Sequence, residues 1–439
     1  MTAHYAIRGR RAQALVESIE AGVREGRLLA GAPLPTVRAL AGELGVSPTT
    51  VAAAYRALRA RGVLSARGRL GTRVSARPPL PAAAQPPLPS HLRNLAEGNP
   101  DPRLLPRLKP PALPRRPRLY GEEHNLPELV RLAARQLSDD GIPAGSLAVV
   151  GGAMDGIERV LQAHLRPGDV VAVEDPGFFA VFDLVAALGL VAEPVAVRDE
   201  AGVAPEALEQ ALRAGARAAI LTPRAQNPTG AAWDEARARE LRALLARHPD
   251  LLVIEDDHAG PVAGAPALTL AHPRRARWAV VRSVSKSLGP DLRLAALAAD
   301  PLTVGRVEGR QALGVGWVSH VLQRLVAHAW AEAAVQRQLA TAAATYTARR
   351  EELVRALARH GISAHGRSGL NVWIPCAEEA ATVAALAEAG WAVQAGERYR
   401  LESPPAMRVT VASLEPGEVP QLAQAIGAAL RPQRRAPSR

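Results

Sequence analysis

One lysine of this chain lies in a segment where an amine can do covalent chemistry. Lys286 sits in the run SVSKSLG (residues 283–289), directly after an apolar stretch that reads as a β-strand. Of the 54 basic residues only two are lysines, and the other is Lys109. A primary amine at a strand end, flanked by small hydroxyl residues, is typical of lysines that bind an aldehyde cofactor as a Schiff base. The alternative is an ordinary surface lysine.

Two groups of residues can bind a phosphate. One consists of hydroxyl and guanidinium groups near Lys286, and the other of backbone amides where a glycine turn opens a predicted helix. Their members are Ser283, Ser285 and Arg293 in the first group, and Gly152, Ala153 and Met154 in the second. Together with the lysine, these groups favour pyridoxal 5′-phosphate (PLP) as cofactor.

Further residues can serve the ring of such a cofactor or a substrate. Phe178 in DPGFF can stack on a pyridine, although a core position is the alternative, and Asn227 in NPTG can bind the ring hydroxyl. One carboxylate of the run EDDH (255–258) can keep the pyridine nitrogen protonated. Arg408 in MRVT can hold a substrate carboxylate through two hydrogen bonds.

An α/β domain must position these residues. From about residue 118, helical patterns alternate with short apolar runs, which predicts a mostly parallel sheet with helices on both faces. The expected helices are 125–140, 153–165, 178–188, 204–213 and 233–247, and the expected strands are 147–150, 170–174, 190–197, 218–222, 251–256, 279–283 and 294–298. Long helices fill 302–359, and a smaller α+β unit of strands and helices closes the chain over 370–430.

The first 75 residues form a separate basic module. They hold 12 Arg and 4 Glu, a net charge of +8, out of +12 for the whole chain. Helices are predicted over 10–26, 37–44 and 48–61, the last two with Thr36 and Ser47 as N-caps. Short strands at 63–66 and 72–75 complete a winged helix-turn-helix. A basic module on a nearly neutral body favours a polyanion as partner.

Residues at three places of this module are candidates for contact with double-stranded DNA. They lie at the start of the second helix, on the recognition helix that follows a four-residue turn, and in the basic hairpin. They are Arg38, Ser47, Thr49, Thr50, Arg56, Arg67, Arg69 and Arg73. A basic surface used for protein contacts is the alternative.

Composition bounds the remaining possibilities. Residues 76–117 are rich in proline and predict an extended linker and approach segment between residues 1–75 and the PLP-binding effector domain, 118–439. The single cysteine, Cys376, allows neither an intrachain disulfide nor a cysteine-rich zinc site. No apolar stretch is long enough to span a membrane and no signal peptide is evident, so we expect a cytoplasmic protein.

The N-terminal module resembles the GntR family of winged-helix regulators. The match runs from Glu25 to Ser75, EGRLLAGAPLPTVRALAGELGVSPTTVAAAYRALRARGVLSARGRLGTRVS. Family members usually carry an arginine after the serine of the turn, and this chain has Pro48 there. One DNA contact of the family is therefore absent, and an operator preference does not carry over.

The remainder, over about 95–430, resembles fold-type I aminotransferases, and the two parts in this order resemble the MocR subfamily of GntR regulators. The resemblance makes Lys286 the PLP-binding lysine and Arg408 the site for an effector carboxylate. By the same resemblance the other positions in contact with PLP are Asp256 at the pyridine nitrogen, Asn227 and His258 at the ring oxygen, Phe178 on the ring, Gly152, Ala153, Ser283, Ser285 and Arg293 at the phosphate, and Tyr120 at the partner subunit's phosphate.

Three positions depart from the aminotransferase pattern. His258 replaces a usual tyrosine, Asn125 a usual glycine, and Gly151 a usual serine or threonine. The resemblance implies a homodimer, and members of the family often pair head-to-tail. It also implies that the protein senses a small amino compound by aldimine exchange at Lys286 and regulates transcription. An active aminotransferase with a secondary or vestigial DNA-binding head is the alternative, and a PLP-free ligand-binding protein is a third.

Overall fold

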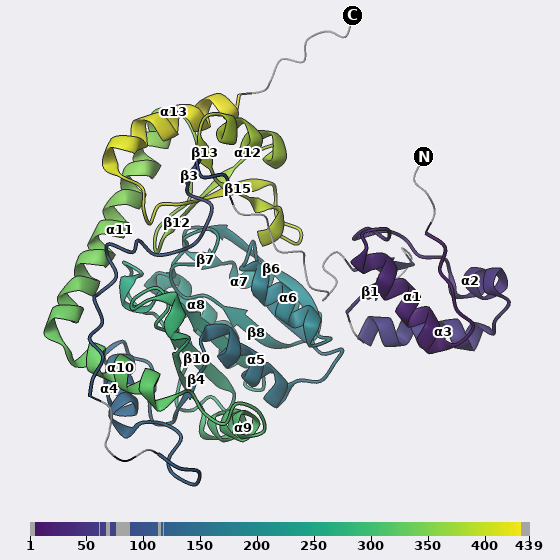
Figure 1. Cartoon of the computed structure of the whole chain (residues 1–439), viewed down its shortest axis with the longest axis horizontal. Helices are drawn as coiled ribbons and strands as arrows, with labels where there is room; N and C mark the ends of the chain where they lie inside the picture. The colour runs from purple at the N-terminus through teal and green to yellow at the C-terminus, as the bar shows by residue number, and fades with distance from the viewer. Residues whose placement is uncertain are drawn as a thin grey trace, which may run out of the picture. The chain divides into compact units, whose positions relative to one another are not determined.

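The computed structural model describes residues 5–60, 62–66, 71–75, 88–112, 116 and 118–431. The chain divides into two compact units (Figure 1). One contains residues 1–86 with 165–171 and 179–193, and the other contains 87–164, 172–178 and 194–439. The head (residues 5–75) and the larger body are described here separately.

The head has three helices and a two-stranded hairpin. They are α1 (Ala12–Arg24), α2 (Val37–Leu44), α3 (Pro48–Ala60), β1 (Leu64–Ala66) and β2 (Thr72–Val74). Thr36 caps α2 by accepting a hydrogen bond from the Ala39 amide at 3.2 Å, and Ser47 accepts one from the Thr50 amide at 3.1 Å. Both N-caps were expected, because hydroxyl side chains satisfy amides that have no partner within the helix. Strands β1 and β2 pair antiparallel, which confirms the winged helix-turn-helix.

The body is built on an eight-stranded sheet. Its strands, in spatial order, are β4 (Leu147–Val150), β11 (Ala295–Ala299), β10 (Trp278–Ser283), β9 (Leu252–Asp257), β8 (Ala216–Leu221), β5 (Val170–Asp175), β6 (Val191–Asp199) and β7 (Gly202–Val203). Strands β8, β9 and β10 run parallel to one another. Strand β11 is antiparallel to both of its neighbours, so β4 has the same direction as β10. The expected mostly parallel sheet is confirmed.

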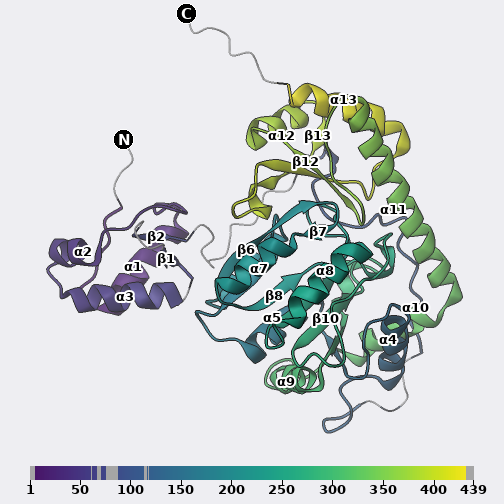
Figure 2. The same ribbon diagram turned by 180° about the vertical axis from the view of Figure 1, so that it is seen from behind.

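Helices cover both faces of this sheet, as Figure 2 shows. The helices of this part of the body are α4 (Pro127–Asp139), α5 (Ala153–His164), α6 (Phe179–Ala187), α7 (Pro205–Arg213), α8 (Glu235–Ala246), α9 (Pro301–Ala312), α10 (His320–Ala331) and α11 (Ala333–Arg359), of which α10 and α11 run along its side. Helix α5 packs closely on the sheet, because a Cβ at Gly156 would lie 3.0 Å from Val281 and 3.1 Å from Val150. Ile157, Val160 and Leu161 of the same helix are fully buried.

A smaller unit follows the long helix α11. It contains β12 (Asn371–Pro375), α12 (Glu379–Glu388), β13 (Trp391–Ala392), β14 (Gln394–Ala395), β15 (Ala406–Thr410) and α13 (Val419–Ala429). Strand β15 lies between β12 and β14. Strand β3 (Arg93–Asn94), at the start of the body, pairs with β13, so the segment after the proline-rich region is anchored in this unit. No helix in the described part of the chain is long and apolar enough to cross a membrane.

Candidate functional site

Lys286 lies in the turn after β10, where the sheet presents the ends of its parallel strands. Its Nζ donates a hydrogen bond to the backbone oxygen of Gly98. Burial, and next the positive charge of Arg408, lower the pKa of Lys286 to about 8, while Asp256 acts in the opposite direction. A lowered pKa increases the neutral fraction of the amine, and the neutral amine is the nucleophilic form.

Asp256 has a buried carboxylate that is not fully paired. Its Oδ1 has no hydrogen-bond partner among the described residues, and its Oδ2 lies 3.7 Å from Nδ1 of His258. Burial, with repulsion from Asp257 and Glu174, raises the pKa of Asp256 to about 7. A cationic N–H donor such as a protonated pyridine nitrogen would satisfy this oxygen and its charge, so the residue fits PLP.

His258 follows β9 and is half-buried beside Asp256. Burial and the positive charge of Lys286 lower the pKa of His258 to about 4, so its imidazole is neutral at physiological pH. A neutral imidazole can donate one hydrogen bond to a ring oxygen, as the tyrosine of related proteins would. The expected role of His258 is compatible with this geometry.

Asn227 and Arg408 meet although 181 residues separate them. Asn227 Oδ1 accepts from Arg408 Nη1 at 3.0 Å and from Asn371 Nδ2 at 3.4 Å. Arg408 is 3% exposed on β15, and its Nη2 donates to the backbone oxygen of Ala96. Its Cζ lies 4.8 Å from the ring centre of Tyr399, while its Nε has no partner among the described residues. A buried guanidinium with an open donor is suited to a carboxylate.

The glycine turn and Arg293 form a narrow cradle at the start of α5. Gly152 has φ +109°, and a Cβ there would lie 2.6 Å from Arg293 Nη2. Arg293 itself has φ +43°, an uncommon conformation for this residue, and its Nη2 donates to Gly151 O at 3.3 Å. Because Ala153 and Met154 begin the helix, their amides lack partners in the preceding turn. The cradle fits a phosphate.

The two serines lie where the sequence predicted them, on and after the end of β10. Ser283 Oγ donates to Ser285 Oγ at 3.1 Å and accepts from the Ser285 amide at 3.2 Å. The pair is thus preorganised on the same turn as Lys286. Phe178 is half-buried directly before α6.

Tyr120 is not brought to this group of residues by its own chain. Its side chain is 92% exposed and packs edge-on against Trp317, with 5.6 Å between ring centres. Asn125, which stands where the family usually has glycine, has a structural role. Its side chain donates a hydrogen bond to Glu308 at 2.7 Å and accepts one from the Val149 amide at 3.2 Å.

The other two carboxylates of β9 already have partners. Glu255 accepts from the Thr269 hydroxyl and from the amides of Leu270 and Ala271. Asp257 accepts from Arg224 Nε at 2.8 Å and from Arg282 Nε at 2.7 Å. Sequence reasoning from the residues left open which carboxylate serves a cofactor, and the structure leaves Asp256 as the incompletely paired one.

Several residues of the site were missed by the sequence analysis. Gly98 and Ala96 contribute only backbone oxygens, which no side-chain motif reveals. Asn371 lies inside the predicted strand 370–374, and Tyr399 lies between the predicted strands 391–395 and 406–412. Neither position carried a pattern that indicated a role in the site.

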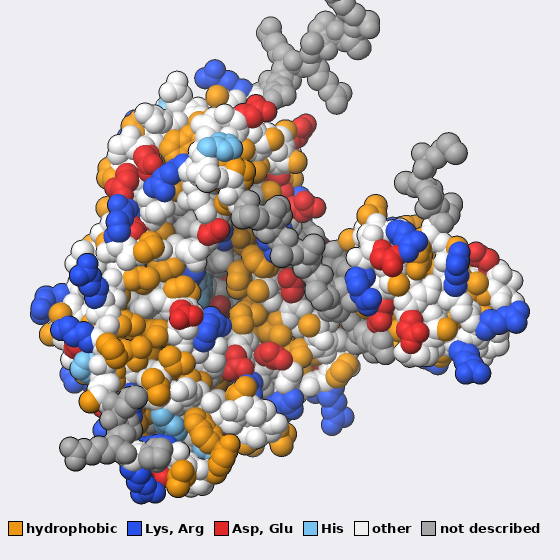
Figure 3. All heavy atoms as spheres, viewed as in Figure 1, with side chains coloured by type: hydrophobic (Ala, Val, Ile, Leu, Met, Phe, Trp, Pro, Cys, Tyr) orange, Lys and Arg blue, Asp and Glu red, His pale blue; other side chains and the backbone are white. Residues whose placement is uncertain are grey.

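In the head, the candidate DNA-contacting residues differ in their exposure and in their hydrogen bonds within the head. Arg38, Thr49 and Arg56 are exposed. Ser47 Oγ lies 2.7 Å from Thr49 Oγ1 and 2.8 Å from Thr50 Oγ1, so three hydroxyls cluster at the start of α3. The visible face of the head carries both basic and acidic side chains (Figure 3).

The wing contributes less evidence. Arg73 is half-buried, and its Nη1 donates to Gly31 O at 3.0 Å, so its guanidinium supports the adjoining loop. Arg67 and Arg69 lie outside the described residues.

Comparisons with known proteins match both parts. Residues 93–426 match the family model described as aminotransferase class I and II, and residues 11–74 match that of bacterial regulatory proteins, gntR family. The chain belongs to the MocR-type GntR regulators. It is therefore a DNA-binding transcriptional regulator with an aminotransferase-like domain, and this domain family implies the use of PLP.

Individual relatives match most of the chain, and a solved aminotransferase structure matches the fold of its larger part. The chain is 42% identical over 431 residues to the "Vitamin B6 salvage pathway transcriptional repressor PtsJ" of Salmonella typhimurium, covering 97% of this chain and 99% of that protein. It is 30% identical to the transcriptional regulator TauR of Rhodobacter capsulatus, covering 81% of each. The fold matches Pyrococcus horikoshii kynurenine aminotransferase in complex with PMP at a TM-score of 0.70 and 19% identity, over 79% of this chain and 92% of that one.

Proposed function

We propose that this regulator senses a small amino compound at a PLP site centred on Lys286. Residues 1–75 bind double-stranded DNA, and residues 118–439 bind PLP and the effector. Residues 76–117 link these two domains. When bound, PLP supplies an aldehyde that reacts with primary amines. The observation that supports the proposal is the open polar atoms around Lys286: Asp256 Oδ1 and Arg408 Nε are buried and without partners among the described residues.

Each residue has a role that its surroundings support. Lys286, with its lowered pKa, offers a neutral amine. Asp256 holds a proton on the pyridine nitrogen, while Asn227 and His258 contact the ring oxygen and Phe178 the ring face. The phosphate would be held by Gly152, Ala153, Met154, Ser283, Ser285 and Arg293.

The effector carries a carboxylate or a similar anion that binds Arg408. Its arrival competes with the bond from Arg408 to Asn227, whereas the binding of PLP to Lys286 competes with the bond from Lys286 to Gly98. An effector regulates only if it binds two conformations of the protein unequally, so these exchanged bonds must favour one of them.

The regulator acts as a homodimer in which Tyr120 reaches the partner's phosphate site. The exposure of Tyr120, together with its contact to Trp317, supports a role outside its own chain. A head-to-tail dimer would present two heads to paired DNA half-sites. Sedimentation velocity that gives a monomer at micromolar concentration would contradict this.

The visible spectrum of the PLP-loaded protein tests the sensing function. Amino acids and amines are titrated while keto acid is assayed. A stable spectral shift without keto acid supports sensing, whereas repeated conversion to pyridoxamine phosphate and back identifies an aminotransferase. Borohydride reduction and peptide mapping must place PLP on Lys286, and Lys286→Ala must lose this adduct. An adduct that persists in the variant would show the assignment to be wrong.

Two substitutions test the DNA-binding head independently. Arg38→Ala and Arg56→Ala should each weaken binding to the operator and reduce its salt dependence, by about one unit of slope for each lost phosphate contact. Arg24→Ala, an exposed arginine on α1, is the matched control. All three variants should keep the PLP spectrum, because the head and the PLP site are separate modules. Loss of the PLP band in Arg38→Ala would contradict the two-module interpretation.

A further inference from the structure

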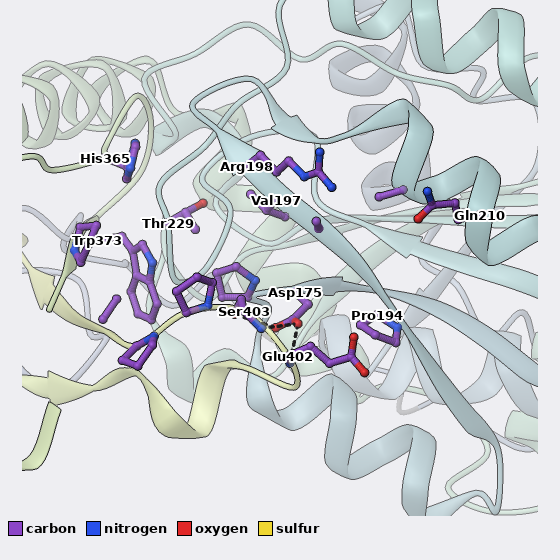
Figure 4. Close-up of a pocket in the computed structure, with 17 residues that line it drawn as sticks. Asp175, Pro194, Val197, Arg198, Gln210, Thr229, His365, Trp373, Glu402 and Ser403 are labelled. Carbon is purple, nitrogen blue, oxygen red and sulfur yellow. Dashed lines mark hydrogen bonds between the residues drawn. The ribbon is translucent and has the colours of Figure 1, made fainter. Parts of the chain in front are cut away.

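A cavity lies in the body, and Lys286 is not among the residues that line it. It has a volume of about 560 Å³, which is within the range of small-molecule sites. Its walls come from β6, α7, the loop after β8, β12 and the loop before β15. Figure 4 shows His365 and Trp373 at one end of the cavity and Gln210 at the other.

Much of the lining is rigid and apolar. Five prolines and the indole of Trp373 contribute to it: Pro176, Pro194, Pro375, Pro404 and Pro405 are the prolines. Proline rings and an indole offer flat apolar surfaces at little cost in conformational entropy. They suit a planar ring.

Arg198 is the arginine among the residues that line this cavity, and it can bind one negative charge. Arg198 on β6 and Gln210 on α7 are exposed, and neither side chain has a hydrogen-bond partner among the described residues. The oxygens of Asp175 already accept hydrogen bonds from the amides of residues 401–403 and from the Ser403 hydroxyl, at 2.7–2.9 Å, so this carboxylate has little capacity left for a ligand. Glu402 is the other acidic lining residue and disfavours a second negative charge on a ligand.

The walls of this cavity are connected to the lysine site. Gln226 donates to Pro176 O at 2.8 Å and accepts from the Thr229 hydroxyl at 2.6 Å, and both partners line the cavity. The next residue after Gln226 is Asn227, which contacts Arg408. On the other side, Trp373 packs edge-on against Tyr399, whose ring lies under Arg408.

We propose that this cavity is a second ligand site, for a planar ring compound with a single carboxylate, and that its occupation alters the affinity of the lysine site. The carboxylate binds Arg198 and Gln210, and the ring lies against the prolines and Trp373. This site is additional to the proposed effector site at Arg408. The two sites are coupled through Gln226 and through Tyr399.

Calorimetric titration with indole-3-acetate tests the site. The protein is the borohydride-reduced, PLP-loaded form, in which the lysine site is filled, and the titration is repeated with unreduced protein. We expect saturable binding that Arg198→Gln weakens at least about fivefold and that Arg213→Gln, on α7 but outside the cavity, leaves unchanged. The neutral indole-3-acetamide should bind more weakly, and inorganic phosphate should not compete.

Three outcomes would overturn the site: no saturable binding, equal binding by Arg198→Gln, or displacement by inorganic phosphate. If Arg198→Gln does not fold, Ala196→Phe, which fills the cavity, must abolish binding instead. Coupling has its own readout, the dissociation constant of free PLP. Saturating indole-3-acetate should change it at least about twofold in the wild type but not in Arg198→Gln, and an unchanged constant in the wild type would overturn the coupling.

Discussion

Strand β9 carries three consecutive carboxylates, and its two faces treat them differently. Side chains alternate along a strand, so Glu255 and Asp257 lie on one face and Asp256 on the other. Asp257 has two arginine partners, whose positive charges hold its pKa far below the usual range despite burial. Asp256 has no such partner, and burial raises its pKa to about 7. Asp257 is therefore held in an ion-pair network of the fold, whereas Asp256 keeps a charge available for a ligand.

Removing the charge of Asp257 should have the largest effect on the free energy of unfolding. Asp257→Asn leaves Arg224 and Arg282, both about 95% buried, with weaker neutralisation. We expect the free energy of unfolding to fall by about 3 kcal/mol, because an unpaired buried charge is costly. Urea denaturation of the protein without PLP measures it.

Asp140→Asn is the matched control for that substitution. Asp140 also pairs with Arg282, at 2.6 Å, but its side chain is 35% exposed, so a smaller loss is expected. An equal loss of unfolding free energy in both variants would show that the buried Asp257 stabilises the two arginines no more than the partly exposed Asp140 does.

Removing the charge of Asp256 should change the free energy of unfolding in the opposite direction. A carboxyl whose pKa is raised in the folded state loses stability as pH rises from about 4 to about 7. At pH 8, Asp256→Asn should therefore stabilise the PLP-free protein by about 2–3 kcal/mol, and the gain should vanish near pH 4. The same variant should bind PLP more weakly, since the pyridine nitrogen loses its anionic partner.

Glu255→Gln is the comparison for Asp256→Asn. Burial also raises the pKa of Glu255 to about 7, but its carboxylate accepts several hydrogen bonds. An amide cannot accept at both positions, so the gain in unfolding free energy should be smaller than for Asp256→Asn. A larger gain would mean that burial alone, and not the missing partner, sets the cost at Asp256.

The smallest effect concerns His258 and sharpens the same comparison. Because the pKa of His258 falls to about 4, the folded state binds fewer protons than the unfolded state between pH 4 and 6.5. This contribution makes stability rise with pH, opposite to that of Asp256. His258→Gln should remove about 1–2 kcal/mol of that rise, as unfolding curves at pH 4.5 and 7 would show. An unchanged pH dependence would mean that the imidazole titrates normally.

Sequence reasoning captured the local features and missed the distant contacts. The caps at Thr36 and Ser47, the alternation of strands and helices, and the place of Lys286 at a strand end all follow from short-range rules. The choice of Asp256 came from a family resemblance, because alternation gives a face but not the partners on it. The contact of Asn227 with Arg408 depends on how the eight-stranded sheet packs against the smaller C-terminal sheet that contains β15. No local pattern in the sequence encodes this packing.

The hydrogen bonds from Lys286 and Arg408 to Gly98 and Ala96 have one more consequence. Both acceptors lie on the segment that begins the body, just beyond the proline-rich stretch from the head. PLP on Lys286 and an effector on Arg408 would together remove both of these hydrogen bonds from that segment. The segment would then be held in the body by its backbone pairing with β13, without these two side-chain contacts.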